Sequence, residues 1–251
     1  MGTLFVVATP IGNLSDISQR ALQTLRDVDL IACEDTRQTI KILNHFGIQK
    51  TLTSYHEFNE EQKAEELLKD LAGSKTIALV SDAGTPAIAD PGYRLVRLCR
   101  QKNIPVIVIP GPSAVASALS VSGLPSDEFL FLGFLPAKKN ARRDKLASIV
   151  NVTATLVLYE APHRIDAALE DIQDVLGDRE VCIARELTKI HEECLFGRLS
   201  EVRPHVNALG EFVIVVHGAT EVCHQIPRTR DEVLRALGMT RNELYDLFFK
   251  K

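Results

Sequence analysis

The sequence has no long apolar run, few cysteines and no large excess of charge of one sign. Its apolar segments are broken by glycine, proline or charged residues, and none approaches the ~18 apolar residues that a membrane-spanning helix needs. The chain passes directly into a predicted strand, without the basic and apolar segments of a signal peptide. We therefore expect a cytoplasmic protein that makes no membrane contact.

The cysteines argue against a disulfide-bonded protein, and the net charge argues against a nucleic-acid-binding protein that is basic as a whole. The chain has five cysteines, an odd number without a C-x-x-C pair: Cys33, Cys99, Cys182, Cys194 and Cys223. We expect them to be reduced, small, buried side chains of a cytosolic protein. The net charge of −4 shows that the chain is not basic as a whole, so a nucleic acid would need a local basic patch.

Several motifs with well-defined chemistry are also missing. The chain has neither the G-x-G-x-x-G of dinucleotide-binding proteins nor the G-x-x-x-x-G-K-[ST] of nucleotide triphosphatases. It also lacks the G-x-S-x-G turn of α/β-hydrolases. His191-Glu192-Glu193 begins like the zinc motif H-E-x-x-H but has no second histidine, so no metal site is expected.

Short apolar runs alternate with amphipathic segments in the first half of the chain. Predicted strands cover 4–8, 28–33, 76–80 and 105–109, with helical patterns between them. Helices are expected to begin at Ser15, at Asn59 with Gln62 as a capping box, and at Pro91. This alternation predicts a largely parallel sheet with helices on its faces.

The composition changes after residue 134. The segment "PAKKNARRDK" (136–145) has five basic residues and one acid, which is typical of a domain boundary followed by a basic helix. Closely spaced strands at 154–159, 180–184, 194–197 and 212–216 then predict a mixed sheet with antiparallel members. The expected division is an N-terminal α/β domain (1–135), a C-terminal α/β domain (136–222) and a helical tail (223–251). A docked helical hairpin is favoured for the tail over a helix-turn-helix.

Segments rich in small residues follow the strands of the first half. They are "ATPIGN" (8–13), "CEDTR" (33–37), "SDAGTPAIADPG" (81–92) and "PGPSAVASAL" (110–119). The carboxyl ends of parallel strands form the ligand-binding edge of an open α/β sheet, and small residues let a ligand approach the backbone closely. Ser113 begins a helix, where backbone amides bind an anion. These segments predict a ligand cleft rather than ordinary loops.

Two charged segments follow strands in the second half. "LYEAPHR" (158–164) and "ARELTK" (184–189) form either surface ion pairs of little energetic value or a second wall of the cleft. Their repetition at strand ends favours the second wall.

Taken in order, these segments carry a family resemblance. "VVATPIGNLSDIS", "CEDTR", "SYHEFNE", "SDAGTP", "DPG", "PGPSA", "LYEAPHR" and "ARELTK" together resemble the tetrapyrrole methylase superfamily, and most closely its ribosomal RNA branch. The resemblance extends from about residue 4 to about residue 218. It implies two α/β domains of the tetrapyrrole methylase type, S-adenosylmethionine in the cleft between them, and a homodimer. In that branch the reaction is 2'-O-methylation of a cytidine ribose in the decoding region of small-subunit ribosomal RNA, either naked or in the assembled subunit.

The resemblance also suggests which residues contact the cofactor. The matching positions are Ile11, Asp82, Gly84, Thr85, Ser113, Ala114, Leu158, Tyr159 and Ala184. Ser81-Asp82-Ala83 stands where porphyrinoid enzymes more often have G-D-P, a difference typical of the RNA branch.

A ribose hydroxyl is a weak nucleophile, so a general base is expected to assist in-line methyl transfer. The first candidate is His56, and Glu34 is the second. The predicted phosphate contacts are Arg37, Lys138, Lys139, Arg142, Arg143, Arg164, Arg185 and Lys189.

Two other functions stay open at this point. A porphyrinoid C-methyltransferase shares the fold and the cofactor but predicts an apolar, planar cavity. A ligand-sensing regulator would bind DNA through its tail, but Glu243 and Asp246 oppose a surface that faces phosphates.

Overall fold

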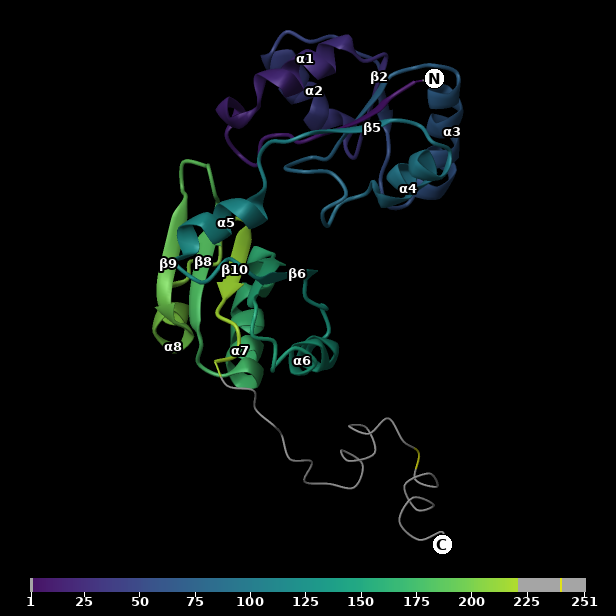
Figure 1. Ribbon diagram of the computed structural model, residues 1–251. Helices are drawn as coiled ribbons and strands as arrows, with labels where there is room; N and C mark the ends of the chain where they lie inside the picture. The colour runs from purple at the N-terminus through teal and green to yellow at the C-terminus, as the bar shows by residue number, and fades with distance from the viewer. Residues whose placement is uncertain (1, 221–239, 241–251) are drawn as a thin grey trace, which may run out of the picture.

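The computed structural model describes residues 2–220 and residue 240, and it shows two α/β lobes, one above the other in Figure 1. The first lobe is built on a five-stranded sheet in the order β3-β2-β4-β1-β5, in which every pairing is parallel. Its strands are β1 (Leu4–Val7), β2 (Leu30–Cys33), β3 (Leu52–Ser54), β4 (Ile77–Val80) and β5 (Val106–Ile109). The predicted parallel sheet is thus confirmed, although β3 had not been predicted.

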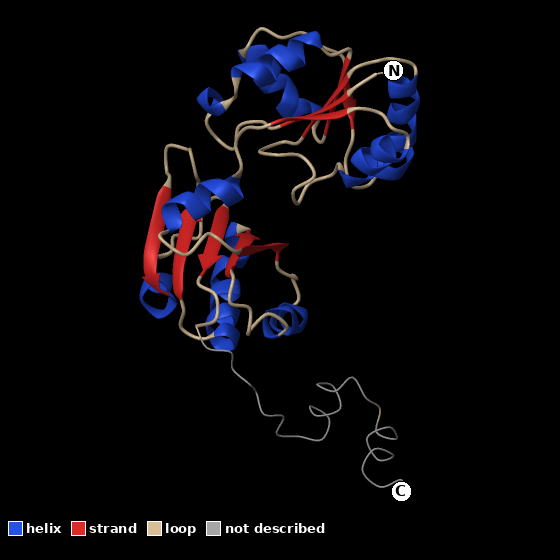
Figure 2. Cartoon of the chain, in the orientation of Figure 1, coloured by secondary structure: helices blue, strands red, loops and turns tan. Residues whose placement is uncertain are grey.

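Helices cover both faces of this sheet (Figure 2). The helices of the first lobe are α1 (Gln19–Asp27), α2 (Thr36–His45), α3 (Glu60–Ala72) and α4 (Tyr93–Gln101), with a short 3-10 turn at Leu14–Asp16. Leu25 and Leu43 of α1 and α2 pack on the face that carries Val7. Leu67 and Leu95 of α3 and α4 pack on the face that carries Leu4. Each strand contributes apolar side chains to both faces of the sheet, because successive side chains along a strand point in opposite directions.

Two of the three predicted helix starts are wrong, and the third is confirmed without its capping box. Ser18, not Ser15, caps α1, and its Oγ accepts a hydrogen bond from the Ala21 amide at 3.0 Å. Asn59 is the N-cap residue of α3 as predicted, but its side chain accepts a hydrogen bond from the amide of His56 at 2.9 Å, so it makes no capping box. Helix α4 begins at Tyr93 instead of Pro91, because Gly92 before it has φ of +145°, which is incompatible with a helix.

The second lobe contains a mixed sheet in the order β6-β7-β10-β8-β9. Among the described pairings of this second sheet, β6–β7 is parallel and the other three are antiparallel, as the predicted mixed sheet requires. Its strands are β6 (Phe129–Phe134), β7 (Thr155–Glu160), β8 (Glu180–Arg185), β9 (Glu193–Arg198) and β10 (Phe212–Val216). Its helices are α5 (Ala114–Ser122), α6 (Lys139–Ala147), α7 (Ile165–Leu176) and α8 (Leu199–Val202), with 3-10 turns at Pro162–Arg164 and Arg203–His205.

The chain moves from the first sheet to the second between β5 and α5. Helix α5 packs on β8 and β10 through Val115, Ala118 and Leu119, and β6 pairs with β7. Both elements precede residue 135, where the composition suggested the domain boundary. The change in composition marks the end of β6, which the sequence reading had missed, rather than the change of sheet.

The structure also bears on the expectations for the cysteines, the C-terminal tail and membrane-spanning helices. Cys33, Cys99 and Cys182 are buried and free as expected, whereas Cys194 is exposed on the edge strand β9. Cys223 and the predicted helical tail lie outside the described residues. Within residues 2–220, no helix is long and apolar enough to cross a membrane.

Candidate active site between the two lobes

The strand-end segments of the first lobe are hydrogen-bonded to one another. The amide of Thr9 donates to the carbonyl of Gly84 at 2.8 Å, and the amide of Gly84 donates back to Thr9 at 3.0 Å. The amide of Asp35 donates to the Asp82 carboxylate at 2.9 Å. The segments 8–13, 33–37 and 81–92 therefore form one connected edge of the sheet, as their positions after parallel strands predict.

The segment after β5 joins the same edge and begins α5. The hydroxyl of Thr85 donates to the carbonyl of Pro112 at 3.2 Å. Ser113 is the N-cap of α5, and its Oγ accepts a hydrogen bond from the Ala116 amide. Gly84 has φ of +81°, a conformation that favours glycine and brings bare backbone toward the space in front of α5. This edge offers an anion-binding helix N-terminus beside exposed backbone.

The register of the second sheet builds the opposite wall. Val213 of β10 pairs with Tyr159 of β7 on one side and with Ala184 of β8 on the other. Residues that pair directly across strands point to the same face, so these three side chains share the face on which α5 packs.

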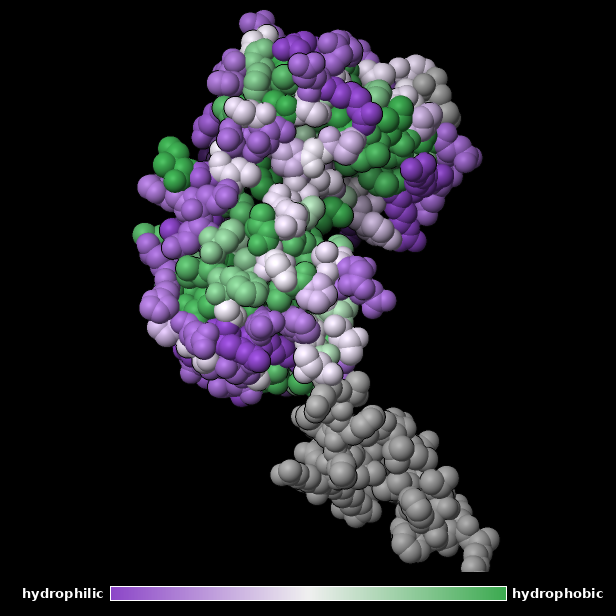
Figure 3. All heavy atoms as spheres, turned by 60° about the vertical axis from the view of Figure 1, so that its left-hand side comes forward, coloured by the Kyte–Doolittle hydropathy of each residue, from purple (hydrophilic) through white to green (hydrophobic). Residues whose placement is uncertain are grey.

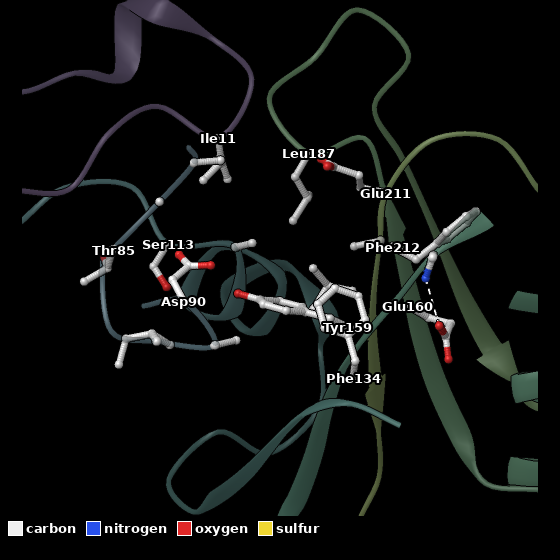
Figure 4. A pocket seen from close by; sticks show the side chains of 18 of the residues that line it. Ile11, Thr85, Asp90, Ser113, Phe134, Tyr159, Glu160, Leu187, Glu211 and Phe212 are labelled. Atoms are coloured by element: carbon white, nitrogen blue, oxygen red, sulfur yellow. Dashed lines mark hydrogen bonds between the residues drawn. The ribbon is translucent and has the colours of Figure 1, made fainter. Parts of the chain in front are cut away.

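A cavity of about 370 Å³ lies between these two walls (Figure 4). Its volume is within the range of small-molecule sites. The predicted cofactor residues that line it are Ile11, Gly84, Thr85, Ser113, Ala114, Tyr159 and Ala184. The two charged segments of the second half do contribute to it, through Tyr159 to Pro162 and through Leu187 and Lys189.

The lobes also meet beside this cavity at the opening turn of the chain. A Cβ at Gly12 would lie 2.4 Å from the Cγ of Lys189, so the turn at 9–13 packs closely on the 184–189 segment. Lys189 was predicted to bind phosphate, but its ammonium group pairs with Glu186 at 2.8 Å and with Glu211 at 2.9 Å.

Two predicted cofactor residues do not line the cavity. Leu158 is completely buried in the core on the α7 side of the sheet, because it neighbours Tyr159 on β7 and must point to the opposite face. The Asp82 carboxylate holds the Asp35 amide instead, so it positions the edge of the cavity.

The predicted bases His56 and Glu34 also lie outside the cavity lining. His56 is half-buried, and its Nδ1 is buried without a hydrogen-bond partner among the described residues. Burial raises the pKa of Glu34, and the negative charges of Asp82 and Asp90 raise it further. Their catalytic roles stay predictions.

Arg142 corrects the predicted phosphate-binding surface. It is only 4% exposed, and its guanidinium forms a salt bridge with the buried Asp171 at 2.6 Å. Arg142 lies on the inward face of α6 and holds α6 against α7, so its charge is not available to RNA. Arg143 pairs with Asp171 and Asp174 at the edge of the same cluster.

The other residues predicted to contact phosphate differ in whether their positive charge is paired with a carboxylate. Arg164 pairs with Glu160, and Arg185 pairs with Glu193. Arg37 is exposed and pairs with Asp35. Lys138 and Lys139 are exposed and form no salt bridge within the described chain.

Twelve of the twenty residues that line the cavity were not predicted from the sequence. The additional lining residues are Ala83, Ile88, Ala89, Asp90, Phe134, Glu160, Ala161, Pro162, Leu187, Glu211, Phe212 and Val213. The register of β10 could not be known from the sequence, which explains the omission of Phe212 and Val213. A usable signal existed for Asp90, because the notable segment 81–92 contains it.

Among the residues that line the cavity, Asp90 has a pKa far from the ordinary value of its side chain. Burial raises the pKa of Asp90 to about 6, and the charge of Asp82 adds to this effect. Burial also raises the pKa of Tyr159, with a contribution from Asp90, so the Tyr159 phenol stays protonated at neutral pH.

Comparison with known proteins agrees with this fold. The family model described as Tetrapyrrole (Corrin/Porphyrin) Methylases matches residues 3–203. The "Ribosomal RNA small subunit methyltransferase I" of Vibrio cholerae serotype O1 is 51% identical over 247 residues, which are 96% of this chain and 85% of that protein. The protein of the same name from Thermotoga maritima is 49% identical over 221 residues, covering 87% and 99%.

A solved structure has the same fold at much lower identity. The uroporphyrin-III C-methyl transferase from Thermus thermophilus, complexed with S-adenosyl homocysteine, aligns with a TM-score of 0.58 and 18% identity. The alignment covers 85% of this chain and 97% of that one. The protein is therefore an α/β protein of the tetrapyrrole methylase family. Within that family, the chain belongs to the group named ribosomal RNA small subunit methyltransferase I, as the resemblance of its motifs implies.

Proposed function

We propose that this protein transfers a methyl group from S-adenosylmethionine to the 2'-hydroxyl of a cytidine in small-subunit ribosomal RNA. The observation that carries the proposal is about 50% identity, over nearly the whole chain, to proteins named for methylation of this RNA. We propose that the protein acts in the cytoplasm, where it would meet ribosomal subunits.

The cavity fits the proposed donor chemically. Apolar side chains such as Ile11, Leu187 and Val213 suit an adenine ring, and the amides of Ser113 and Ala114 at the start of α5 would hold a carboxylate. Asp90 gives the cavity wall a negative charge, which favours a sulfonium cation. When bound, the donor supplies an electrophilic methyl carbon.

The direct test is methyl incorporation from labelled S-adenosylmethionine into small ribosomal subunits that lack the modification. We expect label in the RNA, mapped to one cytidine ribose, with the assembled subunit and naked RNA compared as substrates. Label in a tetrapyrrole and not in RNA would identify a porphyrinoid C-methyltransferase instead.

The exposed lysines before and within α6 are proposed to contact RNA phosphates. Replacing Lys138 and Lys139 with alanine is expected to weaken RNA binding and to reduce the slope of log K against log salt by about 1.4–1.8, the value for two lost contacts. The measurement is RNA affinity between 50 and 300 mM salt, on the order of the range in which such slopes are resolved. The matched control replaces the exposed Lys69 and Lys102, which lie at α3 and α4. Equal slopes for both double variants and the wild type would contradict the assignment.

The proposed homodimer has a candidate interface on the second lobe. Figure 3 shows hydrophobic side chains gathered on the face that carries α5 and β9, where Val121 and Phe196 are each 57% exposed. An exposed apolar face of this kind fits a second copy of the chain. Sedimentation should show a dimer for the wild type and a monomer for Phe196→Glu, and a dimeric variant would exclude this face.

A further inference from the structure

Asp90 projects into the cavity from the wall of the first lobe. It lies in the segment 81–92, in which Ala87 and Ala89 have φ of +66° and +63°, so a backbone of unusual conformation holds it in place. Figure 4 shows the Asp90 carboxylate beside Ser113 at the start of α5, with Tyr159 extending toward it from the opposite wall. The carboxylate therefore lies where groups from both lobes converge.

The other carboxylates that line the cavity, Glu160 and Glu211, are paired with cationic side chains. The Glu160 carboxylate is buried, accepts the Ala161 amide at 2.9 Å and pairs with Arg164 at 3.2 Å. Glu211 is neutralised by Lys189. Asp90 has a hydrogen bond with Ser81 that opposes the effect of burial on its pKa, but it forms no salt bridge with any described residue, so it is the cavity carboxylate without a cation.

We propose that Asp90 is the catalytic base that accepts the proton of the ribose hydroxyl during methyl transfer. This inference rests on the proposed function and goes beyond it by naming the proton acceptor. The hydroxyl oxygen forms a bond to the methyl carbon, the carbon–sulfur bond breaks with its electron pair going to sulfur, and the hydroxyl proton moves to an Asp90 carboxylate oxygen. The positive charge of the sulfonium and the negative charge of Asp90 are both lost, so charge and atoms balance.

The electrostatic surroundings suit this role. Asp82, on the same segment, and Glu34, after β2, place further negative charge near Asp90, and Tyr159 faces it from β7. With a pKa of about 6, Asp90 is mostly ionised at neutral pH, yet it is a stronger base than an ordinary aspartate. The rate of transfer should therefore rise with pH as Asp90 loses its proton and then reach a plateau.

The first test compares Asp90→Asn with the wild type in single-turnover methyl transfer to the subunit substrate. We expect a loss of about 10²–10⁴-fold at saturating donor, the usual contribution of a general base, and loss of the inflection near pH 6. Asp90→Glu should recover part of the rate. The matched control is Asp70→Asn, which removes a surface carboxylate that pairs with Lys75, and its rate should equal that of the wild type.

The second test measures donor binding by calorimetry in the absence of RNA. Wild-type affinity for S-adenosylmethionine should fall by about threefold or more as Asp90 is protonated below pH 6, the size expected for one charge pair at close range. Affinity for the neutral S-adenosylhomocysteine should change little, and Asp90→Asn should abolish the difference. This measurement also shows that the variant is folded.

The outcomes separate this inference from the proposed function. If the wild type methylates the RNA and Asp90→Asn does so at a similar rate, Asp90 is not the base and the proposed function stands. The same conclusion follows if His56→Ala or Glu34→Gln loses transfer and Asp90→Asn does not. If the wild type methylates no ribosomal RNA, the proposed function fails and the inference fails with it.

Discussion

The Asp171→Asn variant is expected to lose about 3–5 kcal/mol of unfolding free energy, the usual cost of removing one partner of a buried ion pair. Asp171 is 1% exposed and binds the guanidinium groups of Arg142 and Arg143. Replacing it with a neutral amide leaves the Arg142 charge buried between α6 and α7 without a counter-ion. Urea denaturation followed by circular dichroism measures the loss.

The control for this prediction is Asp174→Asn. Asp174 also pairs with Arg143 but is exposed, so its loss should cost about 0–1 kcal/mol. Similar losses for the two variants would show that the Arg142–Asp171 pair does not hold α6 in place.

The same pair predicts an acid-sensitive component of stability. Burial favours the neutral form of Asp171, but the ion pairs with Arg143 and Arg142 outweigh it and lower the pKa of this carboxyl. A carboxyl with a lowered folded-state pKa contributes stability above its unfolded pKa of about 3.9, and this contribution is lost as pH falls toward the folded value. The stability difference between the wild type and Asp171→Asn should therefore shrink below about pH 4.

The Ser113→Asp variant is expected to bind S-adenosylmethionine about 10- to 100-fold more weakly than the wild type, as close like charges predict. Aspartate caps a helix as well as serine does, so α5 should still form. Its negative charge, however, would occupy the helix N-terminus that is proposed to hold the donor carboxylate.

Ser113→Asn is the matched control, because asparagine also caps a helix but carries no charge. It should bind the donor within about threefold of the wild type, since no charge–charge repulsion is introduced. Calorimetry on both variants, with thermal melting to verify the fold, provides the measurement. Equal affinities for the aspartate and asparagine variants would mean that no anion binds at this helix end.

The sequence allowed prediction of those parts of the site that follow from local rules. Segments after parallel strands must meet at one edge, which is why Gly84, Thr85 and Ser113 could be assigned to the cavity before the structure was known. The alternation of apolar runs and amphipathic helices similarly predicted the sheet of the first lobe.

Long-range register and burial were not predictable in this way. Leu158 and Tyr159 are adjacent in one apolar run, but only the orientation of β7 decides which of them faces the cavity. Arg142 and Lys139 belong to one basic segment, and only the packing of α6 on α7 buries the former and exposes the latter. The segment 81–92 indicated that Asp90 lies at the edge of the cleft, but only the packing of the two lobes places it opposite Tyr159, on which its proposed role depends.

The central claim is that the cavity between the lobes holds the methyl donor beside Ser113, Asp90 and Tyr159. A crystal structure of the protein with S-adenosylhomocysteine tests it most directly. We expect the amino-acid end of the ligand at the start of α5 and its sulfur on the side of the cavity where Asp90 lies. A ligand seated elsewhere, or an empty cavity at saturating ligand, would contradict the claim.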